Sequence, residues 1–177
     1  MTGEREANVL GALAQAVTDQ TTAAITAATG QSPSAAAALT ALDQFLDRPT
    51  LDRLRLVLGL TPSGAVRLVD RLSQAGLVTR GPGGDGRSRS VMLTERGRAA
   101  AAEVAAARAT VLRDLLRDFS AADRKTLGRL LDRLMAGVVA GKDGGAWICR
   151  QCDLAACDRA AGRCPAANAA AAKYGKP

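Results

Sequence analysis

The sequence predicts a mainly α-helical fold with a small β-wing, a winged helix-turn-helix flanked by long helices. The 177 residues are 47% hydrophobic but only 2% aromatic, and a core of Ala, Leu and Val favours packed helices over a β-sandwich. Apolar residues recur with helical spacing in several segments. Residues 61–97 follow the order helix, strand, glycine-rich turn, strand, helix, which is the order of a recognition helix followed by a wing.

The first predicted helix covers residues 4–29 and ends at Gly30. A second is predicted over residues 32–46, with Ser32 or Ser34 as its cap and a proline in its first turn. The first helix carries a narrow apolar stripe, which fits either a partner helix from a second subunit or packing on the same chain. That stripe consists of Val9, Leu10, Leu13, Val17 and Ile25.

Two short helices predict a helix-turn-helix. Thr50 caps the first, over residues 51–58, and Thr61 caps the second, with Pro62 at its first position and Gly76 at its end. This spacing is typical of a helix-turn-helix, although an ordinary helical hairpin has the same pattern. The second helix leaves four residues away from its apolar stripe: Ser63, Gly64, Arg67 and Arg71.

A two-stranded ribbon is predicted next, from β-prone runs at 77–80 and 90–93 around the sequence GPGGDGRSR. Arg87 and Arg89 lie near its tip, where guanidinium groups can reach a minor groove or phosphates. A solvated hairpin with solubilising charges is the alternative interpretation.

The C-terminal half predicts three more helices. Thr94 caps one that continues to Phe119, and Ser120 caps another that continues to residue 141, with Asp123 placed for a capping box. A short final helix is predicted over 168–174.

Charge and composition limit the function. The formal net charge is +7, with 24 Lys and Arg against 17 Asp and Glu, which suits a polyanionic partner such as nucleic acid. The chain has no histidine, no phosphate-binding glycine loop before a helix and no convincing carboxylate pair, so we do not expect an enzyme. It begins without a signal-peptide pattern and has no run approaching the ~20 apolar residues of a membrane span, so we expect a cytoplasmic protein without a membrane partner.

Two runs of sequence carry a family resemblance. LVDRLSQAGLV followed by DGRSRSVMLTERG is similar to the MarR family of bacterial winged-helix transcription factors, over residues 4–141. The resemblance implies a homodimer held by long dimerisation helices at both ends. It also implies recognition helices in successive major grooves of a palindromic DNA operator, wings in the adjacent minor grooves, and a small-molecule or redox effector. Repression is the usual output of the family.

The resemblance places Thr61, Ser63 and Arg67 on the recognition helix and makes Asp85 and Arg87 the wing-tip pair, in which the carboxylate orients the guanidinium. With the local argument above, the predicted DNA-binding residues are Thr61, Ser63, Arg67, Arg71, Asp85, Arg87 and Arg89. Pro62 and Gly64 stand where many members carry Arg and Thr, so the operator sequence is not predicted.

The chain ends in a segment outside the family pattern, with cysteines spaced C-x2-C-x4-C-x6-C. Four thiolates without a histidine suit soft tetrahedral coordination, either of Zn²⁺ or of an iron–sulfur cluster, and the spacing does not separate the two. Reactive thiols or disulfides are further alternatives, and Arg150, Arg159 and Arg163 could offset thiolate charge. The predicted metal ligands are Cys149, Cys152, Cys157 and Cys164.

The sequence therefore predicts four parts: a dimerisation helix (1–30), a DNA-binding domain (31–97), further dimerisation helices (98–141) and a linker with a metal-binding tail (142–177). The predicted function is a dimeric DNA-binding regulator whose metal site stabilises the dimer or senses redox or metal state. The alternatives are a helical adaptor or anti-activator that does not bind DNA and, less favoured, an enzyme that uses the cysteine tail.

Overall fold

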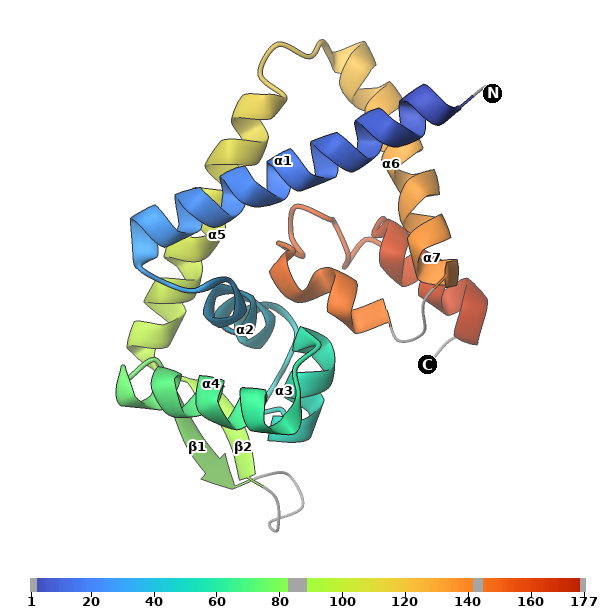
Figure 1. The fold of residues 1–177 in the computed structure, drawn as a ribbon. Helices are drawn as coiled ribbons and strands as arrows, with labels where there is room; N and C mark the ends of the chain where they lie inside the picture. Colours follow the sequence, from blue (N-terminus) through green and yellow to red (C-terminus); the bar gives the residue numbers. More distant parts are fainter. Residues whose placement is uncertain (1–2, 83–88, 142–144, 176–177) are drawn as a thin grey trace.

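The computed structural model describes residues 3–82, 89–141 and 145–175. Within them the fold is helical with one two-stranded antiparallel sheet, as the sequence predicts (Figure 1). In chain order the elements are α1 (Glu4–Thr29), α2 (Pro33–Gln44), α3 (Leu51–Leu58), α4 (Pro62–Gln74), β1 (Val78–Pro82), β2 (Arg89–Leu93), α5 (Glu95–Leu115), α6 (Ala121–Gly141), the 3₁₀ helix η1 (Gly145–Gln151) and α7 (Pro165–Tyr174).

The predicted hydroxyl caps set the helix starts. The side chain of each cap residue accepts a hydrogen bond from the backbone N–H three positions ahead, which satisfies a donor that the first helical turn leaves free. The donor–acceptor distances are 3.0–3.3 Å for Ser32, Thr50, Thr61 and Thr94. At the start of α6, Ser120 and Asp123 form the predicted reciprocal capping box.

The main core lies within the winged helix, where α2, α3, α4 and the sheet meet. Leu39, Leu54, Leu68 and Val69 are almost completely buried there. Val57 is also buried in this core. A smaller cluster of Ile25, Ala36 and Val104 joins α1 and α2 to α5, and α1 crosses α5 in Figure 1.

Several predicted element ends were wrong. Helix α2 ends at Gln44 rather than residue 46, because Phe45 leaves the helical region with φ −157°. Helix α5 ends at Leu115 rather than Phe119, and tighter turns complete the segment. Helix α7 begins at Pro165, a residue that suits the first helical position, rather than at residue 168. The helix η1 was not predicted.

The strands are also displaced from their predicted bounds. They cover 78–82 and 89–93 instead of 77–80 and 90–93, and Arg80 pairs with Val91 in the antiparallel register.

No helix in the described part of the chain is long and apolar enough to cross a bilayer.

Candidate nucleic-acid interface and cysteine cluster

Helix α4 buries one side and exposes the other. Its apolar stripe (Ala65, Leu68, Val69 and Leu72) is buried in the core, while Ser63, Arg67 and Arg71 are exposed as predicted from the spacing. Thr61 is also exposed, but its hydroxyl already caps the helix and lies 3.4 Å from the Ser63 hydroxyl. The exposed face therefore offers two guanidinium groups beside hydroxyl groups.

Polar contacts anchor the base of the sheet to the turns before α3 and after α4. The Thr94 hydroxyl donates to the carbonyl oxygen of Gly76 at 2.7 Å and accepts from the N–H of Gly97. The N–H of Val91 donates to the carbonyl oxygen of Pro49 at 2.9 Å, which ties β2 to the turn before α3. These contacts fix the direction in which the strands leave the domain.

An ion pair joins α4 directly to β1. The Arg80 guanidinium lies 2.5 Å from the Asp70 carboxylate, and both side chains are partly exposed. The sequence does not predict this pair, because the nine residues between Asp70 and Arg80 include a helix end and a turn whose geometry the sequence does not give. The ion pair with Asp70 thus engages Arg80. Among the described residues, no ion pair involves Arg67, Arg71 or Arg89.

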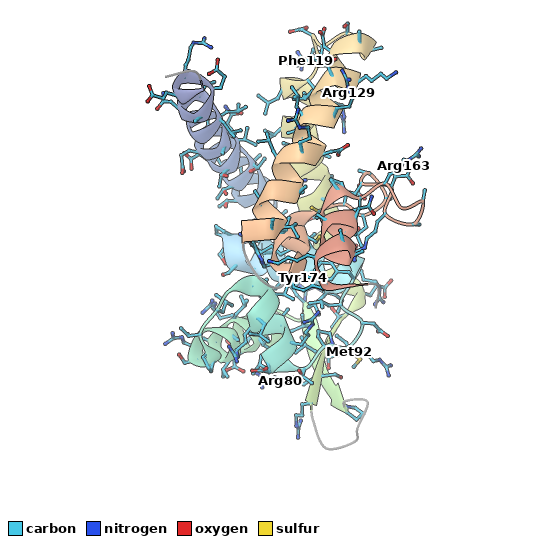
Figure 2. The ribbon with its side chains drawn as sticks, turned by 90° about the vertical axis from the view of Figure 1, so that its right-hand side faces the viewer. Arg80, Met92, Phe119, Arg129, Arg163 and Tyr174 are labelled. Carbon is cyan, nitrogen blue, oxygen red and sulfur yellow. The ribbon has the colours of Figure 1, made fainter. Side chains whose placement is uncertain are left out.

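The predicted DNA-binding residues that the structure describes are at one end of the molecule, on α4 and the sheet. Arg89 is exposed at the start of β2, opposite Pro82. Asp85 and Arg87 lie outside the described residues. In Figure 2, Arg80 and Met92 mark this end of the molecule, while Phe119 and Arg129 mark the opposite one.

The four predicted metal ligands come together in one cluster. Cys149 and Cys164 are 4% and 2% exposed, while Cys152 and Cys157 are half-buried. All four pack in a small apolar core that includes Val139 of α6. A turn brings the first two together, because the N–H of Cys152 donates to the carbonyl oxygen of Cys149 at 2.9 Å.

The thiols influence one another. A hydrogen bond from Cys152 lowers the pKa of Cys149 to about 6, against the effect of burial, and the nearby Arg159 guanidinium adds to the lowering. The same hydrogen bond raises the pKa of Cys152, and burial raises it further. Burial, followed by the neighbouring Cys164, raises the pKa of Cys157. These shifts favour the thiolate form at Cys149 and the thiol form at Cys152 and Cys157.

Two arginines lie near the cluster from different elements. Arg159 donates to the Cys149 sulfur at 3.8 Å, and Arg108, on α5, acts on Cys152 by its charge. Arg150 donates instead to the carbonyl oxygen of Trp147, and Arg163 pairs with Asp158. Arg159 is one of the arginines that the sequence predicts near the thiols, whereas Arg108 was not predicted, because the approach of α5 to the tail is a tertiary contact.

As the side chains stand, no three cysteine or carboxylate groups in the described ranges are placed to hold one metal ion. The thiols are adjacent but do not converge on a point. Rotation of a cysteine between staggered χ1 wells moves its sulfur by roughly 3 Å.

Comparison with known proteins supports the winged-helix interpretation. Residues 32–88 match the MarR family. No curated protein matches the chain. Among solved structures, a MarR family protein from Bacillus stearothermophilus has a TM-score of 0.70 at 24% identity, covering 77% of this chain and 95% of the other.

Two further structures agree. A MarR-family transcriptional regulator from Rhodococcus sp. RHA1 has a TM-score of 0.63 at 19% identity, covering 79% of this chain and 96% of its own. A probable transcriptional regulator from Pseudomonas aeruginosa has a TM-score of 0.55 at 27% identity, covering 70% and 95%. The chain therefore has the winged-helix fold of MarR-family structures, and part of it has no counterpart in them.

Proposed function

We propose that this chain is a sequence-specific DNA-binding transcriptional regulator, a repressor that acts as a homodimer on a palindromic operator. The observation that carries the proposal is the exposed face of α4, where Arg67 and Arg71 face solvent on a helix that the Asp70–Arg80 ion pair joins to β1. The net charge of +7 suits a phosphate backbone. Sequence-specific readout requires side chains at base edges, and the α4 face supplies them.

A dimer accounts for apolar surface that the single chain leaves exposed. Val9, Leu10 and Leu13 of α1 are exposed along one stretch of helix, and α6 exposes an apolar row. Exposed apolar surface of this kind marks interaction sites, and a two-fold dimer matches a palindromic operator because both have the same symmetry. The α6 row consists of Leu130, Leu131, Leu134 and Val138.

DNA binding can be tested by titrating the purified protein against DNA from upstream of its own gene. We expect affinity to fall steeply with salt, because bound arginines release counterions. Arg67→Ala should weaken binding by about 1–3 kcal/mol. Arg129→Ala removes the same charge at the opposite end of the molecule (Figure 2) and should leave affinity close to wild type.

Equal affinity of both variants, or binding that salt does not weaken, would contradict the proposal. That result would favour the helical adaptor that contacts protein instead of DNA.

We further propose that the cysteine cluster binds either Zn²⁺ or an iron–sulfur cluster. Four adjacent thiols are the donor set that both prefer, and the chain has no histidine to compete with them. Binding Zn²⁺ would release the thiol protons into solvent, so metal affinity would increase with pH. Arg108 and Arg159 would offset part of the negative charge of the thiolates.

Elemental analysis and absorption spectroscopy of anaerobically purified protein separate the alternatives. A brown protein with iron and sulfide identifies an iron–sulfur cluster, and a colourless one with about one zinc per chain identifies a structural zinc site. Protein with neither metal, which also fails to take up Zn²⁺ or reconstitute with iron and sulfide, would contradict metal binding.

A further inference from the structure

The C-terminal segment, residues 145–174, lies between α6 and the winged helix (Figure 1). Helix α7 packs along α6, while η1 packs against α2 and α3. The segment therefore contacts both a long flanking helix and the domain that carries α4. A change in the conformational order of this segment can therefore affect both α6 and the winged helix.

On the α6 side, the contact is made by a lysine and a buried valine. The Lys173 ammonium donates to the carbonyl oxygen of Ala140 at 2.9 Å and to that of Val139 at 3.4 Å. A cation at a helix C-terminus is favourable, because the last carbonyl groups lack helical partners. The Val139 side chain is completely buried in the cysteine cluster.

On the winged-helix side, two consecutive residues at the end of α2 make the contact. Phe45 packs both against the winged-helix core and against the cysteine cluster. The Gln44 side-chain oxygen accepts a hydrogen bond from the N–H of Leu154 at 2.9 Å. Leu154 lies between Cys152 and Cys157, so the loop that carries two thiols is tied to α2.

The cysteine cluster lies between the contact to α6 and the contact to α2, and its apolar core is small. Its buried members are Val139, Cys149, Cys164 and Ala166. Helix α7, which carries Ala166, is rich in alanine. A core of this size orders a segment weakly without a disulfide or a metal. Metal binding would supply that order, because binding free energy to a site that forms on folding is folding free energy.

We propose that residues 145–174 form a clamp between α6 and the C-terminal end of α2, and that metal at the four cysteines keeps this clamp closed. The proposal rests on the DNA-binding and metal-binding functions proposed above. A closed clamp fixes the winged helix relative to α6, and in a dimer it would fix the separation of the two α4 helices. The two half-sites of a palindromic operator require a defined separation of the α4 helices. If the two winged helices move freely, DNA binding must first order them, which costs conformational entropy. The metal-loaded protein therefore binds DNA more tightly, and by linkage DNA increases metal affinity.

The test is amide hydrogen exchange on the full chain, purified anaerobically and compared before and after chelation. Removing the metal should accelerate exchange in two regions, residues 145–164 and residues 41–46, which include the end of α2. The same treatment should weaken DNA binding by about fivefold or more, the usual lower range of coupling between sites.

A variant isolates the contact to α2 without touching a thiol. Gln44→Met removes the acceptor for Leu154 and keeps the side-chain length. We expect faster exchange at the Leu154 amide, unchanged metal content, and a smaller effect of chelation on DNA affinity. Gln74→Met is the matched control, on an exposed glutamine at the end of α4, and should leave exchange in the tail unchanged.

Acceleration confined to residues 145–164, with the end of α2 unaffected, would overturn the clamp. So would a Gln44→Met protein that responds to chelation as wild type does. If exchange responds in both regions but no form binds DNA, the clamp stands and the proposed DNA-binding function fails, so the two failures are distinguishable.

Discussion

At Gly97, α5 lies tightly against the backbone of Leu77, the residue before β1, and adding one methyl group there should disturb both stability and the wing. A Cβ at Gly97 would lie inside the contact radius of the Leu77 carbonyl oxygen, 2.9 Å from the carbonyl carbon and 3.1 Å from a Leu93 methyl group. The obstacle is backbone, so it cannot rotate away. To restore a contact of about 3.5 Å with that oxygen, the two segments must separate by roughly 1.5 Å.

The magnitude follows from two opposing terms. Overpacking of this kind costs about 1–3 kcal/mol, and the backbone obstacle places Gly97→Ala at or above the upper value. Alanine regains up to about 1 kcal/mol of helix propensity. The expected net loss is about 2 kcal/mol, which for a chain of this size lowers the melting temperature by about 4–8 °C.

Thermal unfolding followed by circular dichroism, at one protein concentration, measures this loss. The control is Gly137→Ala on α6, where an added Cβ meets nothing within 4 Å in the single chain, so the melting temperature should stay or rise slightly. DNA affinity of Gly97→Ala should also fall, because Leu77 and Thr94 anchor the wing. If Gly97→Ala melts with wild type while Gly137→Ala behaves as expected, the reasoning on this close approach is refuted.

Two further predictions concern the DNA-binding end and the flanking helices. Asp70→Asn breaks the partly exposed pair with Arg80, so it should cost less than about 1 kcal/mol of unfolding free energy in denaturant titrations. It should also leave DNA affinity equal or higher, since it removes a negative charge beside the arginines; a clear loss of affinity would show that the pair positions the wing. Leu134→Arg places a charge in the exposed apolar row of α6 and should shift the protein towards monomer in sedimentation experiments, whereas an unchanged dimer would place the interface elsewhere.

The fold was largely predictable because its signals are local. A hydroxyl three residues before a free N–H, as at Thr50, Thr61 and Thr94, specifies a helix start without any distant contact. The buried and exposed faces of α4 follow from helical spacing of its apolar residues alone. Where prediction failed, as at the ends of α2 and α5, a helix stopped early although the sequence contains no strong breaker at that point.

The candidate site was predictable only in part. The sequence pattern alone indicates which residues of α4 are exposed and which cysteines belong to one set. It could not indicate that Asp70 binds Arg80 or that Arg108 approaches the cysteines. These pairs join residues from different elements, and their distances depend on how the elements pack.

The sequence by itself determined the order of the α-helices and strands, the hydroxyl caps, the exposed arginines of α4 and the four thiols as a group, because each depends on residues close together in the chain. Only the tertiary structure decided that the cysteine tail folds back onto α2, with Phe45 shared between two cores and Gln44 bonded to Leu154, 110 positions away. A contact between segments so far apart depends on shape and burial across the whole fold, and no local pattern encodes it.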